Sequence, residues 1–223
     1  MILKPLVQNK AVNGMTSYNQ EYLHATFKAL TDALLPASTL MNNGQQQIYQ
    51  ASDLFVHEYI IYALDHYITI QQHLYQMRAP LAYPTALMLD VAATYLLNHK
   101  PTQSIQKQHN QHGGVFTTLS RKDRVRTLAC LENLEVDLYS LPSPFQNDAG
   151  LVQYVTDALN RFAYFGNYSE WPAYGTTRNN PPQNRQLQYH PLGWSQVGYP
   201  GPSYGYRDFR GFLLRMGRTG GET

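Results

Sequence analysis

The helix-breaking residues of this chain are gathered toward one end, and this constrains the fold more than any other feature. Residues 166–223 contain ten of the fifteen glycines and six of the thirteen prolines. A segment so rich in these residues cannot form long helices. The same segment carries many aromatic side chains, which argue against plain disorder. We predict an ordered, mostly coil segment that wraps the helical part of the chain or a partner.

Upstream of residue 166, apolar residues recur at helical spacing. This periodicity predicts five helices, over about residues 19–35, 52–75, 86–99, 121–139 and 149–165. Side-chain caps are expected at Ser52, Thr85 and Ser120, the last with Asp123 in a near-capping box. Gly166 is expected to end the fifth helix, because glycine readily adopts the left-handed conformation.

The predicted fold class is therefore all-α. The five helices form one bundle-like domain over residues 1–165, and residues 166–223 are assigned to the same domain. Residues 100–114 are polar and almost free of apolar side chains. We interpret them as a loop inside the domain, because neither flank alone has enough helix to be self-sufficient.

Charge is scarce in this sequence. Charged residues make up only 14%, well below the usual quarter. The net charge of +2 is too small by itself to indicate a nucleic-acid partner, whereas a weakly charged surface is compatible with a protein partner. The single cysteine, Cys130, excludes an internal disulfide and is expected to be a buried thiol.

The expected location follows from hydropathy and from the first residues. No window of about 18 residues is apolar and free of charge, so we expect no transmembrane segment. Residues 1–19 contain neither a secretory nor a twin-arginine leader. We therefore expect a cytoplasmic protein, with association to the cell envelope through a partner as the alternative.

Titratable residues accumulate within an apolar segment only in the second predicted helix. They are His57, Glu58, Asp65, His66 and His73. A helical di-iron site needs Glu-x-x-His pairs, and a zinc-protease helix needs His-Glu-x-x-His, but neither spacing is present. Nucleophile, phosphate-loop and dinucleotide motifs are also absent. We expect no catalytic, cofactor-binding or metal-binding residue, and we keep a stand-alone helical metalloprotein built on these five residues as an alternative.

Three segments resemble those of a known family. Residues 26–38 read TFKALTDALLPAS, residues 164–171 read YFGNYSEW, and residues 194–202 read WSQVGYPGP. They are similar to three features of the gluconate 2-dehydrogenase subunit 3 family: an "ALxPA" stop after the first helix, an aromatic segment after the last long helix, and a closing "W…GYPGP" signature. The resemblance spans most of the chain, and its most distinctive part is GYPGP.

The resemblance implies a small non-catalytic accessory subunit, with a scaffold or maturation role, in a flavin-dependent sugar or polyol dehydrogenase. The large partner is then a flavoprotein of the glucose–methanol–choline class that carries the FAD, and a cytochrome subunit can complete the complex. Many members begin with a twin-arginine leader, so its absence here favours a scaffold or stabilising role over export. A structural protein of the cell or spore surface is a further alternative, suggested by the many Tyr, Gln and Asn residues.

Aromatic residues and arginines interleave near the end of the chain. Trp, Tyr and Arg dominate the energetics of protein interfaces. We therefore predict partner contacts by Trp194, Tyr199, Tyr204, Tyr206, Arg207 and Arg210. Pro200 and Pro202 restrict the backbone on either side of Gly201, so little further entropy is lost on docking. Within this set, Trp194 is expected to pack inside its own protein, and the residues from Tyr204 onward are the better candidates for partner contact.

Overall fold

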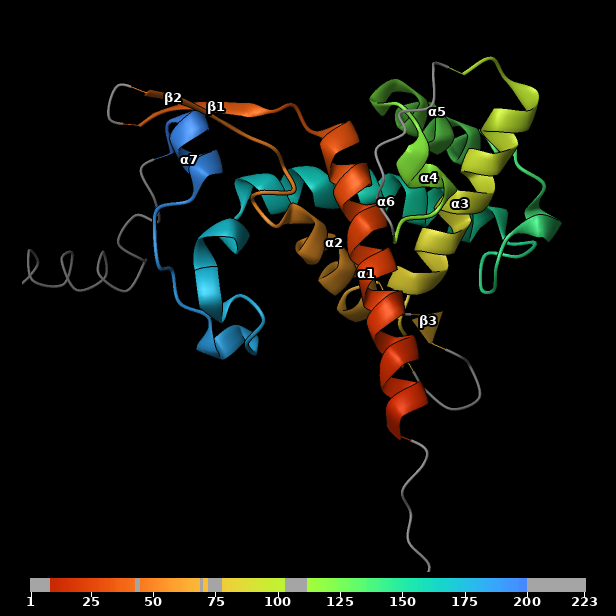
Figure 1. The fold of residues 1–223 in the computed structure, drawn as a ribbon, viewed down its shortest axis with the longest axis horizontal. Helices are drawn as coiled ribbons and strands as arrows, with labels where there is room; N and C mark the ends of the chain where they lie inside the picture. The colour runs from red at the N-terminus through yellow and green to blue at the C-terminus, as the bar shows by residue number, and fades with distance from the viewer. Residues whose placement is uncertain (1–8, 43–44, 69, 72–77, 103–111, 200–223) are drawn as a thin grey trace, which may run out of the picture. The chain divides into compact units, whose positions relative to one another are not determined.

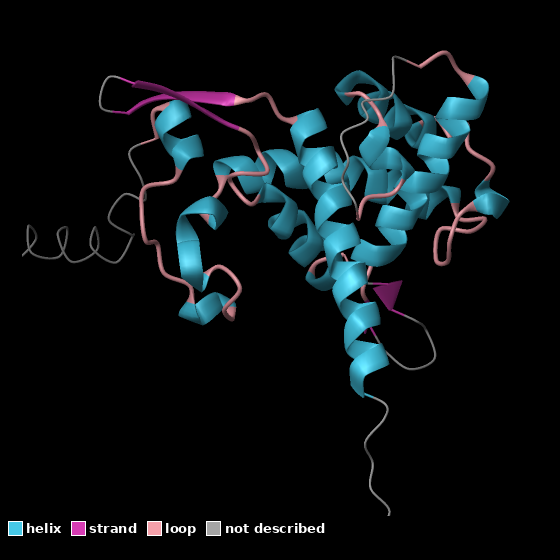
Figure 2. Ribbon diagram, in the orientation of Figure 1, coloured by secondary structure: helices cyan, strands magenta, loops and turns pink. Residues whose placement is uncertain are grey.

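The fold is all-α, as predicted. The computed structural model describes residues 9–42, 45–68, 70–71, 78–102 and 112–199 (Figure 1). The chain forms two compact units, Met1–Asn167 and Tyr168–Thr223. Helices dominate the described residues, and the strands are limited there to two short antiparallel pairs (Figure 2).

Among the described residues, five helices are longer than ten residues, and each corresponds to one predicted helix. They are α1 (Asn9–Leu34), α2 (Val56–His66), α3 (Ala82–His99), α5 (Arg121–Glu132) and α6 (Ala149–Tyr168). Shorter elements lie between them: β1 (Ser38–Asn42), β2 (Gln45–Tyr49), β3 (Ile70–Gln71), β4 (Arg78–Ala79), α4 (Val115–Thr118) and the 3-10 turn η1 (Leu138–Ser140). Strand β1 pairs with β2, and β3 pairs with β4.

Helices α1 and α3 pack together, and each contacts α2, α4 and α5. Helix α1 lies beside α2 and α3 in Figure 1. Its apolar face contributes Phe27 and Leu30, which are fully buried. They join one continuous core with buried side chains of the other helices, among them Ile60, Leu64, Met88, Leu89, Leu131 and Leu159.

The carboxylate of Asp90 on α3 joins three parts of the first unit. The Tyr22 hydroxyl of α1 donates to one oxygen at 2.5 Å, and the Phe116 amide of α4 donates to the other at 2.8 Å. Burial raises the pKa of Asp90, although both hydrogen bonds act in the opposite direction. Gly114 lies so close that a Cβ there would overlap the Asp90 carboxylate, so only glycine fits beside it.

Three predicted helix starts are wrong. Helix α1 begins at Asn9 and not near residue 19, and the starts of α2 and α3 are set by two different features. Helix α2 begins at Val56 and not after Ser52, because Phe55 enters the left-handed region with φ 56° and turns the chain there. Helix α3 begins at Ala82 and not after Thr85. The Asp65 carboxylate of α2 accepts a hydrogen bond from the Ala82 amide at 2.8 Å. A residue 17 positions earlier thus provides the acceptor that the first backbone N–H of α3 needs.

Two of the predicted helices also extend too far toward the C-terminus. Helix α2 stops at His66, because the chain then turns back so that Ile70 and Gln71 pair with Arg78 and Ala79. Helix α5 stops at Glu132, where Leu134 takes a positive φ of 55°. The predicted second and fourth helices were therefore too long.

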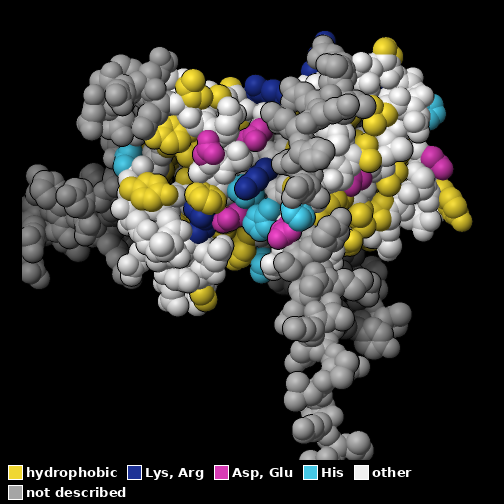
Figure 3. All heavy atoms as spheres, in the orientation of Figure 1, with side chains coloured by type: hydrophobic (Ala, Val, Ile, Leu, Met, Phe, Trp, Pro, Cys, Tyr) yellow, Lys and Arg dark blue, Asp and Glu magenta, His cyan; other side chains and the backbone are white. Residues whose placement is uncertain are grey.

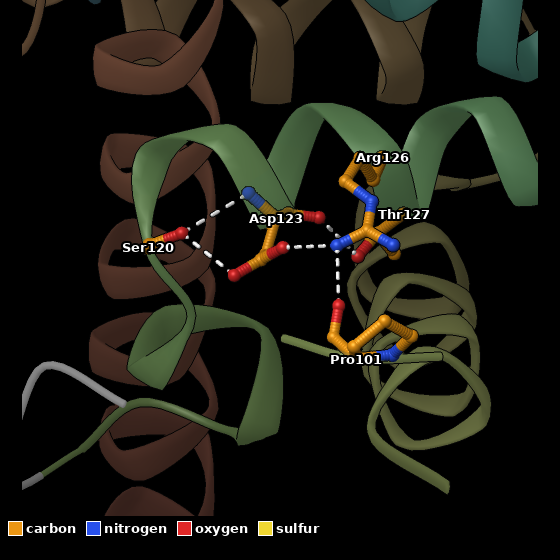
Figure 4. A network of polar contacts seen from close by, with 5 residues as sticks. All are labelled: Pro101, Ser120, Asp123, Arg126 and Thr127. Carbon is orange, nitrogen blue, oxygen red and sulfur yellow. Dashed lines mark hydrogen bonds and ion pairs between the residues drawn. The ribbon is translucent and has the colours of Figure 1, made fainter. Parts of the chain in front are cut away.

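The predicted cap at Ser120 is confirmed, and it belongs to a larger network (Figure 4). The Ser120 hydroxyl accepts the Asp123 amide at 3.2 Å and donates to the Asp123 carboxylate at 2.7 Å. The other carboxylate oxygen accepts from Arg126 at 2.8 Å, and Arg126 also donates to the Pro101 carbonyl. Thr127 donates to the Asp123 carbonyl at 2.9 Å. The fully buried Asp123 side chain thereby ties α5 to the segment after α3.

Gly166 does not end α6, contrary to the prediction. The helix continues to Tyr168, and Gly166 is buried inside its last turns. A Cβ at this position would lie 2.8 Å from Tyr59 Cδ1 and 3.0 Å from Val56 Cγ1, both on α2. Glycine is therefore needed here for close approach of two helices and not for a left-handed turn.

We expect Gly166→Ala to lower the free energy of unfolding by about 1–3 kcal/mol, because the added methyl forces α6 away from α2. Thermal unfolding should show a midpoint several degrees lower. Gly150→Ala is the matched control on the same helix, since a Cβ there meets only Asp148 Oδ1 at 3.6 Å. That change should be neutral or slightly stabilising, and equal losses from the two variants would contradict the close-packing role of Gly166.

We expect Asp123→Ala to cost about 2 kcal/mol or more, because it leaves the groups around a buried carboxylate without partners. Ser120→Ala removes only the cap and should cost about 1 kcal/mol. Chemical denaturation measures both. Asp137→Ala is the control, since Asp137 caps the exposed turn η1. A loss from Asp137→Ala as large as that from Asp123→Ala would argue against the network.

Candidate functional site

The structure describes two of the six predicted partner-binding residues. Trp194 lies in α7 (Leu192–Val197), and Tyr199 follows shortly after that helix. The other four, Tyr204, Tyr206, Arg207 and Arg210, lie outside the described residues. A partner role for all six stays a prediction.

Trp194 is built into the second unit. Its side chain is only 8% exposed, and its indole N–H donates to the Tyr168 carbonyl at 2.9 Å. Gly198 ends α7 with φ 68°, which lets the Tyr199 amide donate to the Trp194 carbonyl. The two rings then meet edge to face with centroids 4.9 Å apart. Tyr199 remains 43% exposed, so the buried Trp194 ring holds the accessible Tyr199 ring in place.

The segment before α7 is held by side-chain hydrogen bonds more than by regular structure. It contains the 3-10 turns η2 (Trp171–Thr177) and η3 (Pro182–Asn184). The Gln188 backbone amide donates to the Ala173 carbonyl at 2.9 Å, and the Gln188 side-chain oxygen accepts the Thr176 amide at 3.2 Å. Arg185 lies over the Trp171 ring, 5.1 Å from the ring centroid. The second unit is therefore ordered over its described residues and contains short helices where mostly coil was predicted.

An open aromatic groove lies between α2 and α6 of the first unit. Its volume is about 410 Å³, and it is lined mainly by Tyr59, Tyr67, Tyr154, Phe162 and Phe165. The Tyr59 ring meets Phe162 edge to face and stacks on Phe165, and burial raises the pKa of Tyr59 to about 12. The Phe165, Tyr67 and Tyr154 side chains are 62%, 57% and 52% exposed. Exposed aromatic side chains gathered in this way are typical of binding surfaces.

A cluster of ligating side chains lies where α1 meets α2. His24 of α1 and the consecutive residues His57 and Glu58 of α2 each offer a donor atom, and these atoms all lie within 4.8 Å of one another. In Figure 3, histidine and acidic side chains gather over α1 and α2. Burial lowers the pKa of His24, with Glu58 acting against this shift and Lys28 adding to it.

The other titratable residues of the second helix do not join this cluster. The Asp65 carboxylate accepts a hydrogen bond from the first residue of α3, and burial raises the pKa of Asp65. His66 is exposed, stacks on Tyr62 and contacts the Tyr62 carbonyl through Nδ1 at 2.9 Å. His73 lies outside the described residues. Of the five residues considered from sequence, the structure thus brings together only His57 and Glu58.

His24 was missed in the sequence because it lies 33 positions before His57 and on another helix. The one available signal is that His24 is the single histidine in the predicted first helix, with Glu21 and Lys28 one turn away on either side. Such a residue is more often a satisfied core histidine than a ligand. The packing of α1 on α2 reveals the cluster, because it places the His24 and His57 ring centroids 5.4 Å apart.

Among the described residues, no helix is both long and apolar enough to cross a membrane. No family model, curated protein or solved structure matches the chain. The likeness to the gluconate 2-dehydrogenase subunit 3 family therefore rests on the three sequence segments alone. In the structure, the described parts of those segments lie at the end of α1, at the end of α6 and in α7 with the residues that follow it.

Proposed function

We propose that this protein is a non-catalytic accessory subunit of a flavin-dependent sugar or polyol dehydrogenase of the glucose–methanol–choline class. In this role it binds a large flavoprotein subunit, which carries the FAD, and supports the folding or stability of that subunit. The sequence resemblance supplies the identity of the partner. The aromatic groove between α2 and α6 is the observation that carries a docking role.

The groove suits a protein partner because part of its aromatic surface is already held in place. The buried Tyr59 ring packs on Phe162 and Phe165, so it loses little freedom when a partner covers it. The cation at its margin, Arg161, lies 2.7 Å from Asp157 and is exposed. An aromatic centre with a charged, wet margin is the usual composition of an interface between proteins.

The second unit supplies a further candidate contact. Trp194 is anchored by its indole hydrogen bond, and the exposed Tyr199 ring packs on it. A rigid, partly exposed tyrosine gives contact area at low entropic cost. The contacts predicted for Tyr204, Tyr206, Arg207 and Arg210 concern residues that follow Tyr199 in the sequence.

We expect the double change Tyr154→Ala and Phe165→Ala to weaken binding of the flavoprotein subunit at least about tenfold, because both exposed rings are lost from the groove. The measurement is co-purification with the flavoprotein encoded by a neighbouring gene, with bound flavin read by absorbance. Tyr139→Ala is the matched control, since Tyr139 is 71% exposed and lies on η1, outside the groove. Equal retention of both variants, or a gene neighbourhood without such a flavoprotein, would count against the proposal.

We expect Trp194→Ala to lower the thermal midpoint of the isolated protein by several degrees, because it removes a buried ring and leaves the Tyr168 carbonyl without its donor.

The double change Arg207→Ala and Arg210→Ala should instead weaken co-purification with the flavoprotein and leave the thermal midpoint of the isolated protein unchanged. An arginine pair whose removal alters neither quantity has no part in partner binding.

A further inference from the structure

The cluster at the junction of α1 and α2 combines two imidazoles and one carboxylate. His24 comes from α1, while His57 and Glu58 come from the first turn of α2, and their donor atoms lie within 4.8 Å of one another. Two histidines and a carboxylate form one of the common protein ligand sets for Zn²⁺ and its neighbours among the divalent transition metals. Donor atoms around a tetrahedral Zn²⁺ are roughly 3–4 Å apart, so small side-chain rotations would bring these three to one ion.

We infer that His24, His57 and Glu58 form a binding site for a divalent transition-metal ion, and Zn²⁺, which two histidines and a glutamate bind in zinc enzymes, is the ion used to test it. The site holds the ion between two helices that are far apart in sequence. Three protein ligands leave a further position for water or for a group supplied from outside. The inference is independent of the proposed accessory role, because it depends only on the isolated chain.

The surroundings of His57 indicate a site that is built in advance. His57 is 1% exposed and lies at the second position of α2, directly after the turn made by Phe55. Phe55 takes φ 56°, a conformation that a bulky side chain rarely adopts, and its ring stacks on the His57 imidazole with centroids 6.2 Å apart. Unfavourable backbone conformations of this kind concentrate at ligand sites.

The cluster is also accessible to an ion from solvent. His24 and Glu58 are both partly exposed, so an ion can reach the cluster from solvent without unfolding either helix. Lys28 follows one turn after His24 and is exposed. Because Lys28 is exposed, water weakens its repulsion of a bound cation without removing it.

The test is Zn²⁺ titration of the untagged, metal-free, full-length protein by calorimetry. We expect one equivalent to bind. His24→Gln and Glu58→Gln should each weaken that binding at least about a hundredfold, which is more than is usual for a group that only supports a ligand. His66→Gln is the matched control, because His66 lies exposed on the same helix outside the cluster and its loss should leave the affinity unchanged.

A second measurement protects the test against folding effects. His57 is buried, so His57→Gln can reduce binding by disturbing the helix pair, and circular dichroism of each variant is needed beside the titration. Co²⁺ in place of Zn²⁺ should give visible absorption bands typical of low coordination number in the unsubstituted protein and in His66→Gln. Absence of Zn²⁺ binding, or binding that folded His24→Gln and Glu58→Gln both retain, would overturn the inference and leave a purely structural polar cluster.

Discussion

A carboxylate that leaves water must find hydrogen bonds for both of its oxygens, and Asp90 does so with two different parts of the chain. One oxygen takes the Tyr22 hydroxyl of α1, and the other takes the Phe116 amide of α4. These two hydrogen bonds join α1 and α4 to α3 beside the apolar core. Further polar contacts hold α1 against α5. Arg121 and Arg124 of α5 donate to carbonyls near the end of α1, among them those of Ala29, Ala33 and Leu35.

Local signals in the sequence were enough to predict the class of fold and the five main helices. The cap at Ser120 is also local, because its partner Asp123 is three residues away. Several of the mispredicted boundaries depend on distant residues or on a rare backbone state. The start of α3 is satisfied by Asp65, 17 positions earlier. Gly166 likewise has two uses, as a terminator or as a place of close approach, and only the position of Tyr59 decides between them.

The candidate sites were less predictable than the fold, because each is assembled from separate helices. The groove needs aromatic residues of α2 and α6 on one surface, and the ligand cluster needs His24 of α1 beside His57. Periodicity predicts which face of each helix is apolar, but it does not say which faces meet. Where a site residue lay within one short segment, as with Trp194 and Tyr199, the sequence did indicate an aromatic turn, and the structure adds the hydrogen bonds that hold it.

The close approach at Gly166 has a mechanical consequence. The first unit ends at Asn167, one residue after this glycine, so the chain leaves that unit from the helical turn that is packed on Val56 and Tyr59. Those two residues lie on either side of His57 and Glu58 in the first turns of α2. The point of attachment of the C-terminal unit is thus one helix contact away from the ligand cluster. A side chain larger than glycine at position 166 would therefore press on the two residues that flank His57 and Glu58.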